Sequence, residues 1–218
     1  MSEKKPYTTV LFDLDGTLTD PEIGITTCFQ YALQHFGIEE NDREKLRRVI
    51  GPPLLDSFMQ YYGLSEDDAQ LGIKYYRERF SDIGIFENTV YDGIPEMLNK
   101  LKEAGKKLVL ATSKPHVYAN RILEYFDLAK YIAFVAGSEL DGTRTDKAEV
   151  IRYALEQTGT AADEAIMVGD RKHDVIGAIK NHMDVIGVLY GHGSEEELLK
   201  ADTSLLAQTP ADVAKLIL

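Results

Sequence analysis

Short apolar runs, separated by stretches with helical periodicity, constrain the fold of this 218-residue chain more than any other feature. Each run is almost continuously apolar, which is typical of strands buried on both faces of a parallel sheet. The predicted strands are 9–12, 108–111, 132–136, 165–168 and 185–189. Strands that alternate with helices are joined by right-handed crossovers, so we predict an α/β fold with a doubly wound parallel sheet.

A long segment between the first two predicted strands has the periodicity of helices alone. Apolar residues recur there at three- and four-residue steps, and glycine-containing turns at 51–53 and 63 divide the pattern. We predict four helices that form a small bundle inserted after the first strand. The predicted domains are 1–19 with 85–218 for the sheet, and 20–84 for the inserted helices.

Charge and composition exclude several classes of protein. The net charge of -12 opposes binding to nucleic acid polymers and to anionic membranes. Cys28 is the single cysteine, which excludes a disulfide framework within the chain and a cysteine-rich zinc site. No apolar signal core follows the first six residues, and no apolar run approaches the roughly 18 residues of a membrane span. We therefore expect a cytoplasmic protein.

Two aspartates, Asp13 and Asp15, follow the first predicted strand. Residues i and i+2 of an extended chain point the same way, so we expect the two carboxylates to project together. A solvated Leu-Asp-Gly turn is one interpretation of this pattern. An EF-hand loop is excluded, because its glycine position holds Leu18 and its glutamate position holds Gly24.

Polar side chains follow the other predicted strands as well. Thr112 and Ser113 follow the second strand, Lys147 opens a helix after the third, and Asp170 and Asp174 follow the fourth. Ligands of open parallel sheets bind beyond the carboxyl ends of the strands. Each residue alone has a simpler explanation, as a helix cap, a solvated lysine or acids at a helix start. Together they favour a site for a phosphate, held by the hydroxyls and the lysine, and for Mg²⁺, held by carboxylate oxygens.

The chain resembles the haloacid dehalogenase-like (HAD) hydrolases over nearly its full length. The motifs that match, in order, are Asp13-x-Asp15-Gly16-Thr17, Thr112, Lys147 and Gly169-Asp170-x-x-x-Asp174. Within the family the chain is most similar to phosphoglycolate phosphatases and to a bacterial 5'-nucleotidase-like group, through the stretches 112–115, 137–142 and 187–191. The resemblance implies a Rossmann-like HAD core, and it implies that the inserted helices are the family's small cap domain.

The resemblance also implies a role for each residue of the motifs. Asp13 is the nucleophile that forms an aspartyl-phosphate, and Asp15 is the acid and base. Mg²⁺ is held by Asp13, by the backbone carbonyl of Asp15 and by Asp170, with Asp174 acting directly or through water. Lys147 is catalytic and also binds substrate. The implied substrate-binding residues are Gly16, Thr17, Thr112, Ser113 and Lys147.

These residues predict a Mg²⁺-dependent phosphatase whose partner is a small phosphorylated metabolite. An acid at Asp15 favours a phosphatase over a dehalogenase, with a sugar-phosphate mutase similar to β-phosphoglucomutase as the alternative. A receiver-like phosphoacceptor domain is a remote alternative, because receivers carry the aspartate on a middle strand and have no helical insert. Lys147 is followed by Ala148-Glu149-Val150, whereas phosphoglycolate phosphatases usually have a proline-containing segment there. Phosphoglycolate and nucleotides therefore both remain as substrates.

Overall fold

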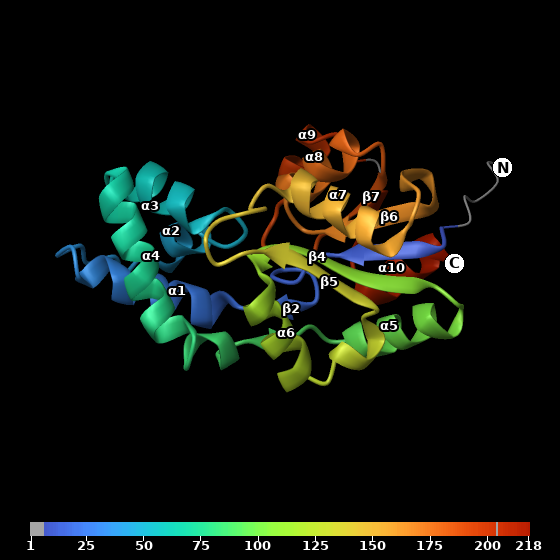
Figure 1. The fold of residues 1–218 in the computed structure, drawn as a ribbon, viewed down its shortest axis with the longest axis horizontal. Helices are drawn as coiled ribbons and strands as arrows, with labels where there is room; N and C mark the ends of the chain where they lie inside the picture. Colours follow the sequence, from blue (N-terminus) through green and yellow to red (C-terminus); the bar gives the residue numbers. More distant parts are fainter. Residues whose placement is uncertain (1–6, 204) are drawn as a thin grey trace. The chain divides into compact units, whose positions relative to one another are not determined.

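The computed structural model describes residues 7–203 and 205–218 and contains a parallel six-stranded sheet (Figure 1). The order of the strands is β5-β4-β1-β6-β7-β8. Their bounds are β1 Thr9–Phe12, β4 Lys107–Pro115, β5 Phe134–Ser138, β6 Ala165–Gly169, β7 Asp184–Val188 and β8 Leu205–Ala207. Val10 pairs with Leu108 of β4 on one side and with Ile166 of β6 on the other. The predicted doubly wound sheet is confirmed, β8 adds a strand that was not predicted, and β1 lies inside the sheet.

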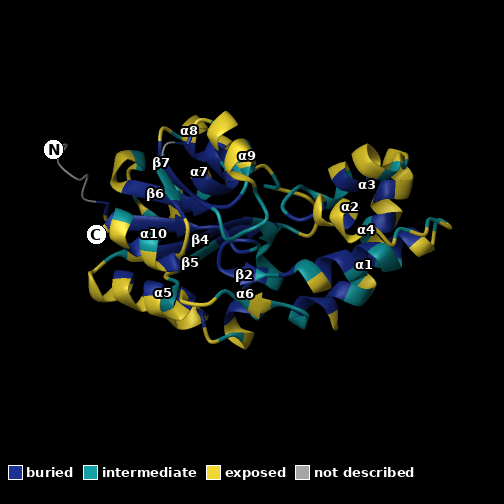
Figure 2. Ribbon diagram, turned by 180° about the vertical axis from the view of Figure 1, so that it is seen from behind, coloured by how far each residue is buried: buried dark blue, intermediate teal, exposed yellow. Residues whose placement is uncertain are grey.

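Helices cover both faces of this sheet, with α7 and α8 on one face and α5 and α6 on the other (Figure 1). The helices of this part of the chain are α5 Ile94–Glu103, α6 His116–Tyr125, α7 Lys147–Thr158, α8 Lys172–Lys180, α9 Glu195–Lys200 and α10 Pro210–Ile217. Short 3₁₀ turns lie at Ala129–Tyr131 and Ala162–Glu164. The strands are buried, whereas the outer faces of the helices are exposed (Figure 2). Leu11, Met167 and Ile151 belong to one buried apolar cluster between the sheet and its helices.

The contacts between residues divide the chain into two units. The core unit contains the residues up to Thr19 together with Val90–Leu218, and the inserted unit is Asp20–Thr89. The inserted unit runs past residue 84, because the 3₁₀ turn Gly84–Phe86 packs on the first helix of this unit. There the Gly24 amide donates to the Glu87 carbonyl at 3.0 Å. The chain passes between the units through a two-stranded sheet of β2 (Thr19–Asp20) and β3 (Thr89–Val90).

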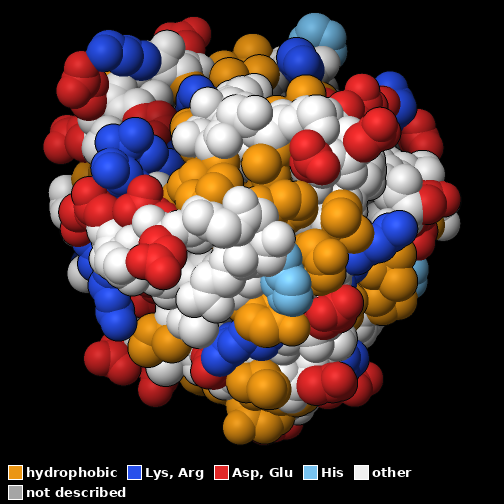
Figure 3. Space-filling view, turned by 90° about the vertical axis from the view of Figure 1, so that its left-hand side faces the viewer, with side chains coloured by type: hydrophobic (Ala, Val, Ile, Leu, Met, Phe, Trp, Pro, Cys, Tyr) orange, Lys and Arg blue, Asp and Glu red, His pale blue; other side chains and the backbone are white. Residues whose placement is uncertain are grey.

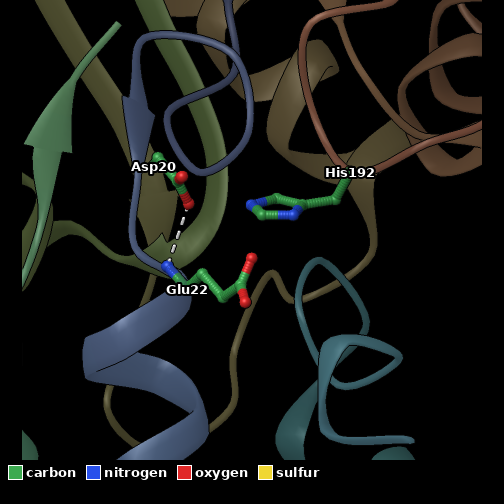
Figure 4. Close-up of side chains that lie close together, drawn as sticks. All are labelled: Asp20, Glu22 and His192. Atoms are coloured by element: carbon green, nitrogen blue, oxygen red, sulfur yellow. Dashed lines mark hydrogen bonds between the residues drawn. The ribbon is translucent and has the colours of Figure 1, made fainter. Parts of the chain in front are cut away.

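Helices make up most of the inserted unit. They are α1 Glu22–Gln34, α2 Arg43–Arg47, α3 Leu54–Tyr62 and α4 Glu66–Phe80. The rings of Phe29 and Phe58 stack in the interior with their centroids 4.1 Å apart, which joins α1 to α3. The Asp20 carboxylate accepts a hydrogen bond from the Glu22 amide at 3.1 Å and so stabilises the start of α1 (Figure 4). Four helices lie where the sequence predicts them.

The surface carries charges of both signs. On the face drawn in Figure 3, Lys and Arg side chains lie among Asp and Glu side chains, with hydrophobic groups between them. That face therefore lacks a continuous basic surface among the residues described, as the net charge of -12 leads us to expect. None of the described helices has the length and apolar character needed to cross a membrane.

Candidate active site

Asp13 lies at the carboxyl end of β1, where both the backbone and the side chain are fixed. Its amide donates to the Val168 carbonyl at 3.0 Å, which continues the pairing of β1 with β6. Its Oδ1 accepts a hydrogen bond from the Leu14 amide at 2.8 Å. The side chain is buried. The carboxylate of Asp13 is therefore held in one orientation at the carboxyl end of β1, which is an inner strand of the sheet.

Lys147 is placed by the start of α7. The side chain of Asp146 caps this helix, accepting hydrogen bonds from the amides of Ala148 and Glu149 at 2.9 and 3.3 Å. This cap satisfies two of the amides that a helix start leaves without partners. Because Lys147 is the first residue of α7, the cap also fixes the point from which its side chain enters the site.

The ammonium group of Lys147 joins three parts of the core unit. Its Nζ lies 2.9 Å from Asp13 Oδ1 and 2.9 Å from Asp174 Oδ1, and it donates to the Ala111 carbonyl at 3.1 Å. Burial alone lowers the pKa of Lys147, but Asp13 and Asp174 together raise it above its ordinary value. The lysine is therefore a permanent cation beside the Asp13 carboxylate.

Asp13, Asp170 and Asp174 form a buried cluster, with one carboxylate oxygen of each within 4.8 Å of the others. Burial, together with the charges of Asp174 and Asp13, raises the pKa of Asp170 to about 8. Burial also raises the pKa of Asp174, although Lys147 opposes the shift. Ionisation of all three carboxylates beside one ammonium would leave two negative charges in a buried place, and a divalent cation would balance them. Hard carboxylate oxygens are also the ligands that Mg²⁺ prefers, so the cluster fits the predicted metal.

Asp170 is held from two sides. Thr17 Oγ1 donates to its Oδ1 at 3.4 Å, and the His192 amide donates to its Oδ2 at 2.8 Å. Glycine at positions 16 and 191 allows the backbone to come close to Asp170. A Cβ at Gly16 would lie 2.2 Å from Asp170 Oδ2, and a Cβ at Gly191 would lie 2.5 Å from Asp170 Cβ. Gly16 and Thr17 therefore contact the acidic cluster directly.

Asp15 forms an ion pair with Lys114, with 2.9 Å between Oδ2 and Nζ. The other carboxylate oxygen, Oδ1, is buried and has no hydrogen-bond partner among the residues described. Burial raises the pKa of Asp15, and the Lys114 ammonium opposes this shift. One carboxylate oxygen of Asp15 is therefore paired with Lys114, and the other has no hydrogen-bond partner among the described residues.

Thr112 and Ser113 were expected to follow the second predicted strand, but the structure places them within it. They lie inside β4, and α6 begins only at His116. The reason is that β4 continues past a register shift and still pairs with β5 at Ser138. Thr112 nevertheless directly follows Ala111, whose carbonyl accepts a hydrogen bond from Lys147.

The sequence did not predict two contacts at this site, the ion pair of Asp15 with Lys114 and the hydrogen bond from the His192 amide to Asp170. The backbone amide of His192, and not its imidazole, makes this contact. The alternation Gly191-His192-Gly193 after a strand is the sequence signal that could have indicated a close backbone approach. A second glycine contact supports this, because a Cβ at Gly193 would lie 1.8 Å from the Asp170 carbonyl oxygen.

Comparison with known proteins finds a family model and relatives that match most of the chain. A family model described as "Haloacid dehalogenase-like hydrolase" matches residues 10–188. A 5'-nucleotidase from Pseudomonas aeruginosa is 52% identical over 192 residues, which cover 88% of this chain and 87% of that protein. Tyrosine-protein kinase PtkA from Mycobacterium tuberculosis is 37% identical over 197 residues, which cover 90% of this chain and 67% of that protein.

Weaker and structural similarities extend the comparison. A phosphoglycolate phosphatase from Vibrio parahaemolyticus is 26% identical over 216 residues, which cover 95% of each chain. The crystal structure of a "predicted phosphatase" from Clostridium acetobutylicum superposes with a TM-score of 0.95 at 49% identity, covering 97% of this chain and 98% of that one. Since the family model and these relatives span most of the sequence, the chain belongs to the haloacid dehalogenase-like hydrolases.

Proposed function

We propose that this HAD phosphatase hydrolyses a small phosphate monoester through a covalent aspartyl-phosphate on Asp13, with Mg²⁺ as its cofactor. One observation carries the proposal. The buried Asp13 carboxylate lies 2.9 Å from the Lys147 ammonium and within 4.8 Å of Asp170 and Asp174. A carboxylate nucleophile must approach an anionic phosphoryl group, so it needs cations at this position.

In the first step, an Asp13 carboxylate oxygen attacks the phosphorus atom. A new bond forms between Asp13 and phosphorus, and the bond from phosphorus to the ester oxygen breaks. Asp15 supplies the proton that the departing oxygen takes up. Lys147 balances charge on Asp13 and on the phosphoryl oxygens, which lowers the barrier to approach.

In the second step, a water oxygen bonds to phosphorus while the bond between Asp13 and phosphorus breaks. Asp15 accepts the proton that the water loses, so both aspartates return to their starting states. We assign substrate binding to Gly16 and Thr17, which contact Asp170, and to Thr112 and Ser113 of β4. Asp13, Asp170 and Asp174, with the Asp15 carbonyl, are the residues that would hold Mg²⁺, which supplies charge neutralisation at the phosphoryl group when it is bound.

For the substrate, we propose nucleoside 5'-monophosphates ahead of phosphoglycolate. The similarity to a 5'-nucleotidase at 52% identity supports this order, whereas the phosphoglycolate phosphatase relative is 26% identical. The absence of a proline-containing segment after Lys147 points the same way. A sugar-phosphate mutase, or transfer to a tyrosine as the name of PtkA indicates for that relative, would need an acceptor other than water.

A panel of esters in Mg²⁺ tests this proposal. Phosphate release from nucleoside monophosphates, phosphoglycolate, sugar phosphates and pyrophosphate is compared as kcat/KM. We expect steady release that is highest with a nucleoside monophosphate and that is abolished in Asp13→Asn. Asp163→Asn is the control, because it makes the same change at an exposed carboxylate of the Ala162–Glu164 turn. Phosphoryl transfer to a sugar or tyrosine without phosphate release would contradict the proposal.

A further inference from the structure

Lys114 has no role in the mechanism described so far, yet it is one of the most sheltered charged side chains of the site. Its side chain is 6% exposed, and that of its partner Asp15 is 13% exposed. Lysine is rarely buried to this extent unless it is paired. The distance of 2.9 Å between Lys114 Nζ and Asp15 Oδ2 shows such a pair.

An irregularity of β4 places Lys114. The pairing of β4 with β5 shifts register between Ala111 and Pro115. Bulges of this kind turn side chains away from the direction that regular alternation gives them. The Lys114 amide donates to Thr112 Oγ1 at 3.2 Å, which stabilises the irregular backbone.

Two contacts from β5 hold this segment in place. Ser138 Oγ donates to the Ser113 carbonyl at 2.8 Å. Gly137 lets the two backbones meet, because a Cβ there would lie 2.8 Å from the Lys114 carbonyl oxygen. The position of the Lys114 side chain is therefore fixed by the sheet and is not that of a free surface lysine.

The ion pair divides the two oxygens of Asp15 between two tasks. Lys114 holds Oδ2, while Oδ1 is buried with no hydrogen-bond partner among the described residues. We propose that Lys114 is a positioning residue for Asp15, which fixes Oδ2 so that Oδ1 is the atom that exchanges the proton. This inference rests on the proposed function, in which Asp15 is the acid and base.

The proton then follows one path in both steps. During phosphorylation of Asp13, the proton on Asp15 Oδ1 moves to the ester oxygen as the bond between that oxygen and phosphorus breaks. During hydrolysis, the proton lost by the attacking water moves to the same Oδ1. Lys114 neither gains nor loses a proton, so its contribution is to orientation and charge.

Leaving-group dependence tests this role. Lys114→Met should lower kcat/KM for an alkyl phosphate by about 10²-fold, the loss expected from a misplaced catalytic group. The loss should be much smaller with p-nitrophenyl phosphate, because nitrophenolate departs without protonation. Lys114→Arg should restore most of the activity, and Lys114→Gln carries the same test if the methionine variant does not fold. Lys107→Met is the control on the same strand, since its ammonium contacts the Thr158 carbonyl instead.

A double variant separates positioning from a structural role. In an Asp15→Asn background, Lys114→Met should cause little further loss, because the group it positions is already gone. An equal loss with both esters, a rise in KM alone, or an undiminished loss in the Asp15→Asn background would each overturn the proposal. These outcomes leave wild-type turnover and the inactivity of Asp13→Asn intact, so they are distinct from a failure of the proposed function.

Discussion

Gly16 shows how closely the backbone approaches the acidic cluster. Its φ of +81° lies in the region that residues with a Cβ avoid. A Cβ at this position would also lie 2.2 Å from Asp170 Oδ2. Any side chain here would therefore strain the backbone and displace a proposed metal ligand at the same time.

The pair Gly16→Ala and Gly105→Ala separates these two effects. Gly105 has a similar φ of +77°, but a Cβ there would meet nothing within 4 Å. We expect both variants to lose about 1–2 kcal/mol of stability from backbone strain. Only Gly16→Ala should also lose Mg²⁺-dependent phosphate release, measured beside urea unfolding. Equal activity in the two variants would show that the approach to Asp170 has no catalytic importance.

At this scale the sequence predicted the residues that follow strands, because the ends of parallel strands meet at one edge. Asp13, Lys147, Asp170 and Asp174 were grouped on that basis, and the structure brings them together. The ion pair of Lys114 could not be predicted, because it depends on the register shift in β4. Strand periodicity carries no information about a bulge until the partner strand is known.

Among the elements, α7 contributes to the site directly, because its first residue is Lys147. The cap provided by Asp146 therefore does two things, stabilising the helix and fixing where the ammonium group enters. The packing of α7 on β4 and β5 fixes the rest of the helix. A loss at the cap should consequently affect catalysis as well as stability.

Asp146→Ala tests this coupling. Loss of a helix cap of this kind costs about 1 kcal/mol, which lowers Tm by about 2–4 °C in a chain of this size. We expect kcat to fall several-fold as well, because the first turn of α7 frays. Thr209→Ala removes the equivalent cap from α10, where Thr209 Oγ1 accepts a hydrogen bond from the Asp212 amide at 3.3 Å. That control should lower Tm with kcat unchanged; a matching fall in kcat for both would argue against a specific role of α7.

Some elements were harder to predict than α7. The sequence located five strands of the sheet but not β8, which is three residues long and offers too few positions to show alternation. The inserted helices were located from their periodicity, and the contacts of the inserted unit extend to Thr89, beyond the predicted boundary at residue 84. The reason is that 85–89 are held by contacts without a helical period. Ile85 is buried, the Glu87 carboxylate pairs with Arg79 at 2.7 Å, and the Glu87 carbonyl accepts from the Gly24 amide.

For the whole molecule, charge is the property that links stability to function. The net charge of -12 repels an anionic substrate, so local cations must overcome it. Within the site, four aspartates face two lysines, Lys147 and Lys114, so ionisation of all four aspartates would leave a charge of -2 in a largely buried place. A divalent cation would balance this negative charge. Because a ligand that binds only the folded state stabilises that state, the cation should also raise the stability of the protein.

Thermal unfolding with and without Mg²⁺ measures this effect. At a concentration about 100 times Kd, Mg²⁺ should stabilise the protein by about 2.7 kcal/mol, or several degrees in Tm. NaCl at equal ionic strength is the control for simple screening. Asp170→Asn should abolish most of the specific shift, because it removes one carboxylate of the cluster. A shift of the same size in that variant would place the cation elsewhere.

Trapping of the covalent intermediate tests the central claim most directly. Asp15→Asn is mixed with p-nitrophenyl phosphate and Mg²⁺, quenched in acid and analysed by intact mass and peptide mapping. Without the group that activates water, the intermediate should accumulate, giving one phosphoryl group per chain, located on Asp13 and released by hydroxylamine. Nitrophenol release with no phosphorylated protein at any time, or a phosphoryl group on another residue, would contradict this account.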